Sequence, residues 1–306
     1  MSESGGTARP TYIPRARGGV RFAALGDSLT EGVGDPVPGG EWRGWAALLA
    51  AGLAPDGAEF LNTARSGALT SHVADEQLPK ARAHRPHIAA VIAGGNDTLR
   101  ATFDIDRVAR HLDTVMSTLQ RDGTVVLTAC LPDPGRLLRL PALLACPLVR
   151  RMQAVNTVVH ALSHRYNALH LHVAAEPWFA QRTALSVDRL HPNELGHRML
   201  AHRFHSLLAE AGLADGPPPS TEPDTAGPGP VDQMVWMATK GTAWVVARCQ
   251  DLLPDLLWLA AAEGRHRLAG TATLLDLRSH RAALHALAAL APVRPLGPAV
   301  RELDLG

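Results

Sequence analysis

Residues 21–32 read Arg-Phe-Ala-Ala-Leu-Gly-Asp-Ser-Leu-Thr-Glu-Gly, and this stretch decides how the rest of the chain is interpreted. The apolar part, 21–25, predicts a buried strand that small and polar residues end abruptly. Ser28 is therefore expected at the carboxyl end of a strand, where ligands bind in open α/β sheets. Gly-Asp-Ser is also ordinary turn chemistry, in which Asp or Ser caps the next helix. The later stretches of sequence must decide between these two interpretations.

Residues 20–212 alternate between short apolar runs and longer amphipathic runs. The apolar runs predict strands at 21–25, 58–62, 87–93, 124–130 and 168–173. The amphipathic runs predict helices at 42–53, 71–82, 105–121, 148–165 and 193–211. Strands and helices that alternate at this spacing predict parallel strands joined by right-handed crossovers, and hence a three-layer α/β fold.

Composition and charge limit the possible partners. The chain has 306 residues, of which 46% are hydrophobic, and a formal net charge of +1, so nothing favours nucleic acid as a partner.

Residues 1–19 are polar and are expected to be a flexible N-terminus without a signal peptide. No apolar run reaches the ~20 residues that cross a bilayer. We therefore expect a cytoplasmic protein with no transmembrane segment.

The cysteines and histidines of the sequence do not have the spacing of a known metal-binding motif. The cysteines Cys130, Cys146 and Cys249 lack metal-ligand spacing, so they are interpreted as reduced, buried thiols. Two pairs of histidines have helical spacing: His160 with His164, and His202 with His205. Neither pair has the carboxylate of a His-Glu-x-x-His motif, so all four are interpreted as surface residues.

Composition changes after residue 212. Six prolines mixed with Gly, Ser and Thr predict a stiff, exposed linker over 213–231. Residues 232–306 are rich in Leu and Ala and predict a helical C-terminal extension. Its apolar stripe is expected to pack on the core or on a second subunit, which allows a homo-oligomer.

The caps within this extension can also be predicted. Asp251 is expected to cap a helix that stops at Gly264, and Ser279 is expected to cap another helix.

The candidate functional residues all precede the linker. Residues 1–214 are therefore expected to fold and to act alone.

Three later strand ends carry residues that suit a serine nucleophile. The loop after the second strand contains Gly67, and the loop after the third contains Asn96. Backbone N–H groups near glycine and an asparagine amide can stabilise a carbonyl oxygen that gains charge. After the last strand, Asp188 lies three residues before His191, so its carboxylate can fold back and orient the imidazole. Each feature taken alone also has a plainer interpretation, as a glycine turn or as the entry to a helix.

Together the four stretches resemble the SGNH, or GDSL, hydrolase family. The stretches are Gly26-Asp27-Ser28-Leu29, the loop ending in Gly67, Gly94-Gly95-Asn96-Asp97 and Asp188-Arg189-Leu190-His191-Pro192, and they occur in the family's order. The resemblance covers about residues 20–212. It implies a flavodoxin-like parallel sheet and hydrolysis of small-molecule esters or related acyl bonds.

The resemblance also implies a role for each site residue. Ser28 would be the nucleophile, His191 the general base and acid, and Asp188 the residue that orients His191. The N–H groups of Ser28 and Gly67, with the Asn96 side chain, would form the oxyanion hole. An acyl-enzyme forms and is hydrolysed in this mechanism, which requires no metal or organic cofactor. One departure is Ala64, which stands where many members have glycine.

Other interpretations stay open beside this one. A non-catalytic binding protein could keep the fold and hold an acylated or glycan ligand. Trp42 and Trp45 either line an acyl pocket or form a core-facing pair. Gly32-Val33-Gly34 begins like a dinucleotide fingerprint, but the third glycine is missing and Pro36 stands where the helix should start. We discount that motif.

Overall fold

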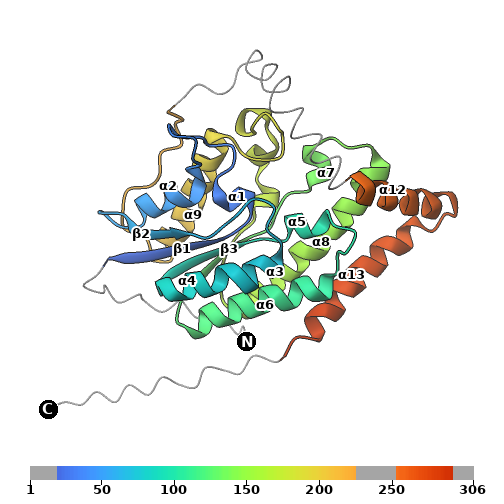
Figure 1. Ribbon diagram of the computed structural model, residues 1–306, viewed down its shortest axis with the longest axis horizontal. Coiled ribbons are helices and arrows are strands. Elements are labelled where there is room, and N and C mark those ends of the chain that lie inside the picture. Colours follow the sequence, from blue (N-terminus) through green and yellow to red (C-terminus); the bar gives the residue numbers. More distant parts are fainter. Residues whose placement is uncertain (1–18, 225–252, 292–306) are drawn as a thin grey trace, which may run out of the picture.

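The computed structural model describes residues 19–224 and 253–291 of the chain. At its centre is a five-stranded sheet with the order β2-β1-β3-β4-β5, and each neighbouring pair is parallel (Figure 1). The strands are β1 (Val20–Gly26), β2 (Ala58–Asn62), β3 (Ile88–Ile92), β4 (Val125–Ala129) and β5 (Leu169–Leu171). This is the flavodoxin-like strand order, so the predicted three-layer α/β fold is confirmed.

Helices cover both faces of the sheet. The α2 helix (Gly44–Gly52) and the α9 helix (Glu194–Glu210) cover one face. The α4 (Leu78–His84), α6 (Ile105–Arg121) and α8 (Ala142–Arg165) helices cover the other. Successive strand residues point to opposite faces, so Ala24 belongs to the first layer and Leu25 to the second.

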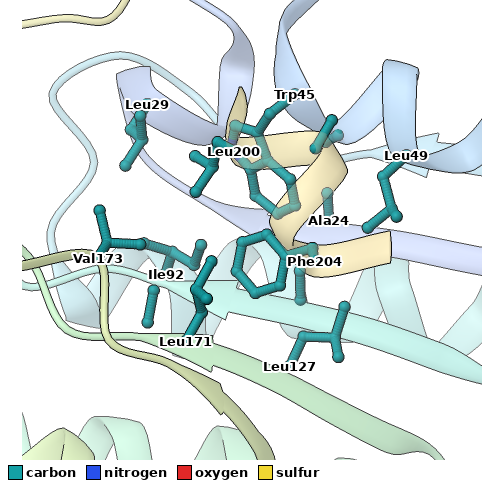
Figure 2. Close-up of a cluster of buried hydrophobic side chains, with 14 of the residues drawn as sticks. Ala24, Leu29, Trp45, Leu49, Ile92, Leu127, Leu171, Val173, Leu200 and Phe204 are labelled. Carbon is teal, nitrogen blue, oxygen red and sulfur yellow. The ribbon is translucent and has the colours of Figure 1, made fainter. Parts of the chain in front are cut away.

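The first layer is built around two aromatic rings. Trp45 of α2 stacks on Phe204 of α9 with the ring centroids 4.8 Å apart (Figure 2). Both rings pack in one cluster with Ala24 and Leu127 of the sheet. This ring pair holds α9 against α2. The N–H of Trp45 also donates to His197, which fixes the first turns of α9 close to the start of α2.

Short helical segments connect these elements. One continuous helical run stands where the helix 71–82 was predicted, and it is slightly longer than predicted. It consists of α3 (Thr70–His72), the π-helical η1 (Val73–Gln77) and α4. The others are α1 (Ser28–Glu31), α5 (Gly95–Thr98), α7 (Pro134–Leu137), η2 (Val173–Ala175), η3 (Pro177–Ala180) and η4 (Arg182–Ala184).

Three predicted helix ends are wrong. The α8 helix begins at Ala142, not at 148, and keeps Pro147 inside it. The α12 helix (Leu253–Leu268) continues through Gly264, because Glu263 and Arg267 form an ion pair one helical turn apart across that glycine. The α13 helix (Ala272–Ala288) begins before Ser279, whose hydroxyl donates to the carbonyl of Arg150 instead of capping a helix. The predicted cap at Asp251 lies outside the described residues.

The C-terminal helices pack on the core. The α12 helix lies against α8, and α13 lies against α6 and α8 (Figure 1). Ala283 and Ala286 of α13 are buried in the same apolar cluster as α6 and α8. Arg150 of α8 binds Glu263 at 3.0 Å and Asp276 at 2.6 Å, which ties both C-terminal helices to one core side chain.

The first part of the predicted linker is also held by the core. The N–H of Asp215 donates to the carbonyl of Leu53, and Asp224 accepts from Arg43 and Arg198. Residues 213–224 are thus bound more closely than the expected exposed linker. Within the described part of the chain, no helix is long and apolar enough to cross a membrane.

Candidate active site

Ser28 is the first residue of α1, directly beyond the end of β1. The Asp27 carboxylate accepts from the N–H of Leu29 at 3.2 Å and caps α1, which fixes the turn on which Ser28 lies. A Cβ at Gly26 would lie 2.3 Å from the carbonyl oxygen of Ile92, so only glycine lets β1 end this close to β3. Ser28 thus occupies the switch point of the strand order, between β1 and β3.

A buried glutamine supports the strand end beneath Ser28. The Gln77 amide accepts from the N–H of Gly26 at 2.8 Å and donates to its carbonyl at 2.9 Å. Both backbone groups of Gly26 are satisfied by one side chain of η1. Sequence analysis missed Gln77, because a single glutamine within an amphipathic helix gives no signal of its own.

His191 and Asp188 join Ser28 in one continuous arrangement. The Nε2 of His191 lies 2.7 Å from the Ser28 Oγ, and its Nδ1 lies 2.6 Å from the Asp188 Oδ2. The other oxygen of Asp188 accepts from the N–H groups of Leu190 and His191, at 2.9 and 3.0 Å. Because the ionised carboxylate only accepts, Nδ1 carries the proton and Nε2 presents its lone pair to the serine hydroxyl.

The electrostatics of Asp188 favour that arrangement. Burial by itself would raise the pKa of Asp188, but the hydrogen bonds from the ring and backbone of His191 outweigh it and lower the pKa below the ordinary value. Asp188 is therefore ionised at neutral pH, as a group that orients an imidazole must be.

The loop that carries His191 is docked tightly on the loop that follows Ser28. A Cβ at Gly34 would lie 1.9 Å from the carbonyl oxygen of Pro192, so the two backbones touch. His197 strengthens the contact, because its Nδ1 accepts from the N–H of Trp45 at 3.2 Å and its Nε2 donates to the carbonyl of Val33 at 3.0 Å. Burial lowers the pKa of His197 to about 4, so the ring stays neutral.

A cluster of charges, which we call the Arg43 clamp, lies behind these loops. Arg43 binds both carboxylate oxygens of Asp35, at 3.0 and 3.1 Å, and also Glu194 at 2.9 Å and Asp224 at 2.8 Å. Arg198 binds the same Glu194 and Asp224. The clamp joins the loop after α1, the start of α9 and residues 213–224. Sequence analysis missed it, because its members are far apart in the chain.

The loops of Gly67 and Asn96 also reach the Ser28 turn. The Asn96 amide donates to the carbonyl of Ala68 at 3.2 Å and lies 3.4 Å from the Asp27 carboxylate. The N–H of Ser66 donates to Glu31 of α1 at 2.7 Å, which holds the Gly67 loop against that helix. Among the described residues, the N–H groups of Ser28 and Gly67 donate to no acceptor.

The two tryptophans have different environments. Trp45 is fully buried in the core, which confirms the core interpretation for that residue. Trp42 is 42% exposed, and its position pairs with Pro36 in a β-bridge of the loop after α1.

A serine, a histidine and an aspartate that meet at the carboxyl edge of a parallel sheet are typical of serine hydrolases with an α/β fold. Residues 24–199 match the sequence profile of the GDSL-like Lipase/Acylhydrolase family, more than half of the chain. The chain belongs to this family and is a serine hydrolase that acts on ester bonds. This confirms the resemblance that the sequence predicted.

Solved structures share the fold. An acetyl xylan esterase variant from Geobacillus stearothermophilus is 20% identical, with a TM-score of 0.51, and the match covers 65% of this chain and 98% of that chain. TesA is 21% identical, with a TM-score of 0.51 and coverage of 62% and 99%. At these identities the likeness is one of fold. No curated protein matches the chain.

Proposed function

We propose that the protein is an esterase that hydrolyses carboxylic esters through a Ser28-His191-Asp188 triad and an acyl-enzyme intermediate. The hydrogen-bonded series from Asp188 through His191 to Ser28, with its distances of 2.6 and 2.7 Å, carries this proposal. The same series argues against a non-catalytic binding protein, since holding a ligand does not require a histidine oriented toward a serine by a carboxylate.

The proposed mechanism follows from the tautomer. His191 takes the Ser28 proton on Nε2 as the serine oxygen attacks the acyl carbon, and Asp188 stabilises the imidazolium that forms. The imidazolium then protonates the leaving alcohol, and the acyl group stays on Ser28. Water, deprotonated by the same Nε2, attacks the acyl-enzyme and releases the acid while Ser28 regains its proton.

The proposed oxyanion hole consists of the Ser28 and Gly67 N–H groups and the Asn96 amide. Its support is that both backbone donors are uncommitted among the described residues, while hydrogen bonds on Ala68 and Glu31 hold the two loops beside Ser28. The two backbone donors are placed in advance, so they cost no reorganisation when charge develops on the carbonyl oxygen.

Acyl and acetyl esters of small molecules are the proposed substrate class. The family match supports acyl ester hydrolysis, and one of the solved structures with this fold is that of an acetyl xylan esterase. Short p-nitrophenyl esters suit a first assay, because they require little beyond the triad and the oxyanion hole.

Substitution of the nucleophile tests the triad. Ser28→Ala should reduce hydrolysis of p-nitrophenyl acetate by about 10⁴-fold or more, because the triad acts as a unit. Ser117→Ala, at a half-buried serine of α6, is the matched control and should keep full activity. A fluorophosphonate should label the wild type at Ser28, read by peptide mass. Full activity in folded Ser28→Ala protein would contradict the proposal.

Substitution of Asn96 tests the oxyanion hole separately. Asn96→Ala should reduce kcat by roughly 10²- to 10³-fold, with a smaller change in KM, because the amide acts mainly in the transition state. Steady-state kinetics with the same ester measures both constants. An unchanged kcat would assign the stabilisation to other donors.

A further inference from the structure

Four side chains of the types that bind transition metals meet at the β5 edge of the sheet. Cys130 follows β4, His170 lies in β5, His172 follows β5, and His160 projects from α8. One potential ligand atom from each of the four lies within 4.8 Å of the other three. None of them belongs to the proposed triad or oxyanion hole. We call this group the Cys130 cluster.

The fold explains why these residues meet, although they have no metal-type spacing in the sequence. The parallel register pairs Thr128 with His170, so two residues further on Cys130 comes beside His172. His160 on α8 then covers the same side, and the three imidazole rings lie with centroids 4.7 to 5.2 Å apart. The sequence predicted a surface position for His160, beside His164, and a buried thiol for Cys130, and neither prediction indicates this juxtaposition.

Hydrogen bonds fix which nitrogen of His170 carries its proton. The Ser163 hydroxyl lies 2.6 Å from the carbonyl of Val159, which only accepts, so Ser163 donates there. Ser163 must then accept from the Thr128 hydroxyl, 2.7 Å away. Thr128 has no proton left, and it therefore accepts from the His170 Nδ1 at 2.9 Å. The His170 Nε2 thus carries a lone pair.

That lone pair is buried and has no partner. Among the described residues, the His170 Nε2 is one of the few buried side-chain atoms without a hydrogen bond. An unpaired buried polar atom destabilises the folded protein, so it calls for an explanation. The second nitrogen of a metal-ligating imidazole usually donates to a hydrogen-bond acceptor, and the Thr128 hydroxyl would be that acceptor here.

We propose that the Cys130 cluster binds one zinc ion, through the Cys130 thiolate and the imidazoles of His160, His170 and His172. One sulfur and three nitrogens suit Zn²⁺, which takes four such ligands in a tetrahedron. Ligand atoms around zinc lie roughly 3.4–3.6 Å apart, given bonds of about 2.0–2.3 Å. The cluster must contract to reach that spacing, and the exposed side chains of His160 and His172 can move inward. Cys130 releases its thiol proton to solvent on binding.

The expected role of this ion is structural. Four protein ligands fill the tetrahedron, whereas a catalytic zinc keeps one position for water or substrate. The ion would fasten the three-residue edge strand β5 to β4 and α8. The segment that follows β5 leads to Asp188 and His191, so the site would secure the base of that segment.

Cobalt substitution tests the site. The full-length protein, stripped with a chelator under reducing conditions, is titrated with Co²⁺ and followed by absorption. We expect saturation at one ion per chain, with a thiolate-to-cobalt charge-transfer band and the intense visible bands of tetrahedral cobalt, both removed by Zn²⁺. At a Zn²⁺ concentration one hundred times its Kd, Tm should rise by about 5–10 °C. A protein that gives no thiolate band overturns the proposal.

Matched variants decide whether the ion binds at this cluster. Cys130→Ser should abolish the charge-transfer band, whereas Cys146→Ser and Ser28→Ala should keep it. His160→Ala and His172→Ala change exposed side chains, so they should fold and bind Zn²⁺ at least tenfold more weakly in competition with a chromophoric chelator. His164→Ala, one turn along α8 from His160, should bind like the wild type. Wild-type affinity in both His160→Ala and His172→Ala would exclude the site even if Cys130→Ser fails to fold.

Discussion

Asp27 is held in a position that disfavours its charge. It caps α1, lies next to Ser28, and is buried beside Asn96. Burial is the main reason that its pKa rises from 3.8 to about 6. The folded protein therefore keeps the Asp27 proton up to about pH 6, while the unfolded chain releases it near pH 4. Stability from this residue is present at low pH and is lost as the pH rises through that interval.

Asp27→Asn should remove this pH dependence. We compare the free energy of unfolding of the variant with that of the wild type at each pH. This difference should be greater at pH 7.5 than at pH 4 by about 2 kcal/mol, slightly less than the equivalent of the whole pKa shift, because the unfolded chain is still partly protonated at pH 4. Urea denaturation of both proteins at the two pH values measures it. The control is Asp122→Asn, because Arg82 lowers the pKa of this exposed carboxyl, so any effect should be small and opposite in sign. Equal differences at both pH values would contradict the assignment.

The sequence predicted the residues around Ser28 better than the residues that hold them. The nucleophile turn, the Gly67 and Asn96 loops and the pair Asp188 and His191 are short local patterns that follow strands. Gln77 and Arg43 act on partners up to 51 and 181 residues away, respectively. Their roles depend on which distant segments meet, and no local pattern contains that information.

The Arg43 clamp shows how elements on one side of the protein depend on a single side chain. Asp35 is 1% exposed, and its two oxygens are both bound by Arg43. Hydrogen bonding to Asp35 is the main cause that raises the pKa of Arg43 above its ordinary value. Removal of the guanidinium would leave a buried carboxylate without its cation.

We expect Arg43→Ala to lower the free energy of unfolding by about 3–5 kcal/mol, the usual cost of breaking a buried ion pair. Arg82→Ala is the matched control, because Arg82 forms a similar pair with Asp122 on the surface, where such pairs contribute about 0–1 kcal/mol. Urea denaturation at pH 7.5 compares the two. A similar loss in both variants would show that the clamp adds nothing beyond a surface pair.

Strands and most core helices were predicted closely, whereas the start of α8 and the helix ends in the C-terminal part were not. The predicted strand 58–62 and helix 105–121 match β2 and α6 in both bounds. Asp104 explains the start of α6, because its side chain accepts from two N–H groups of the first turn. Gly264 ends no helix, because the ion pair across it and the packing of α12 on α8 outweigh the poor helix propensity of glycine.

For the whole molecule, we propose that residues 20–212 form the catalytic unit and that the C-terminal helices stabilise it. Every proposed catalytic residue lies within this range. The α12 and α13 helices pack mainly on α6 and α8. Residues 213–224 differ from them, because Asp224 joins the Arg43 clamp and the carbonyl of Gly216 contacts His205 of α9.

Two truncations separate these contributions. A chain ending at residue 224 should hydrolyse p-nitrophenyl acetate at close to the full-length rate, with a lower Tm. A chain ending at 214 should be less stable again, because it loses Asp224 from the clamp. Thermal unfolding and the ester assay on all three chains test this order. Inactive or unfolded protein from both truncations would mean that the C-terminal helices complete the core.

The separation of Ser28 from its partner histidine along the chain has a consequence for synthesis. The hydrogen bond between them spans 163 residues, and the bond from Arg43 to Asp224 spans 181. Contacts between such distant residues form slowly, and the N-terminal part of a chain leaves the ribosome first. The proposed nucleophile is therefore made early, and we expect it to stay inert until His191 has been translated. A chain whose translation stops before His191 would carry the serine without its proposed base.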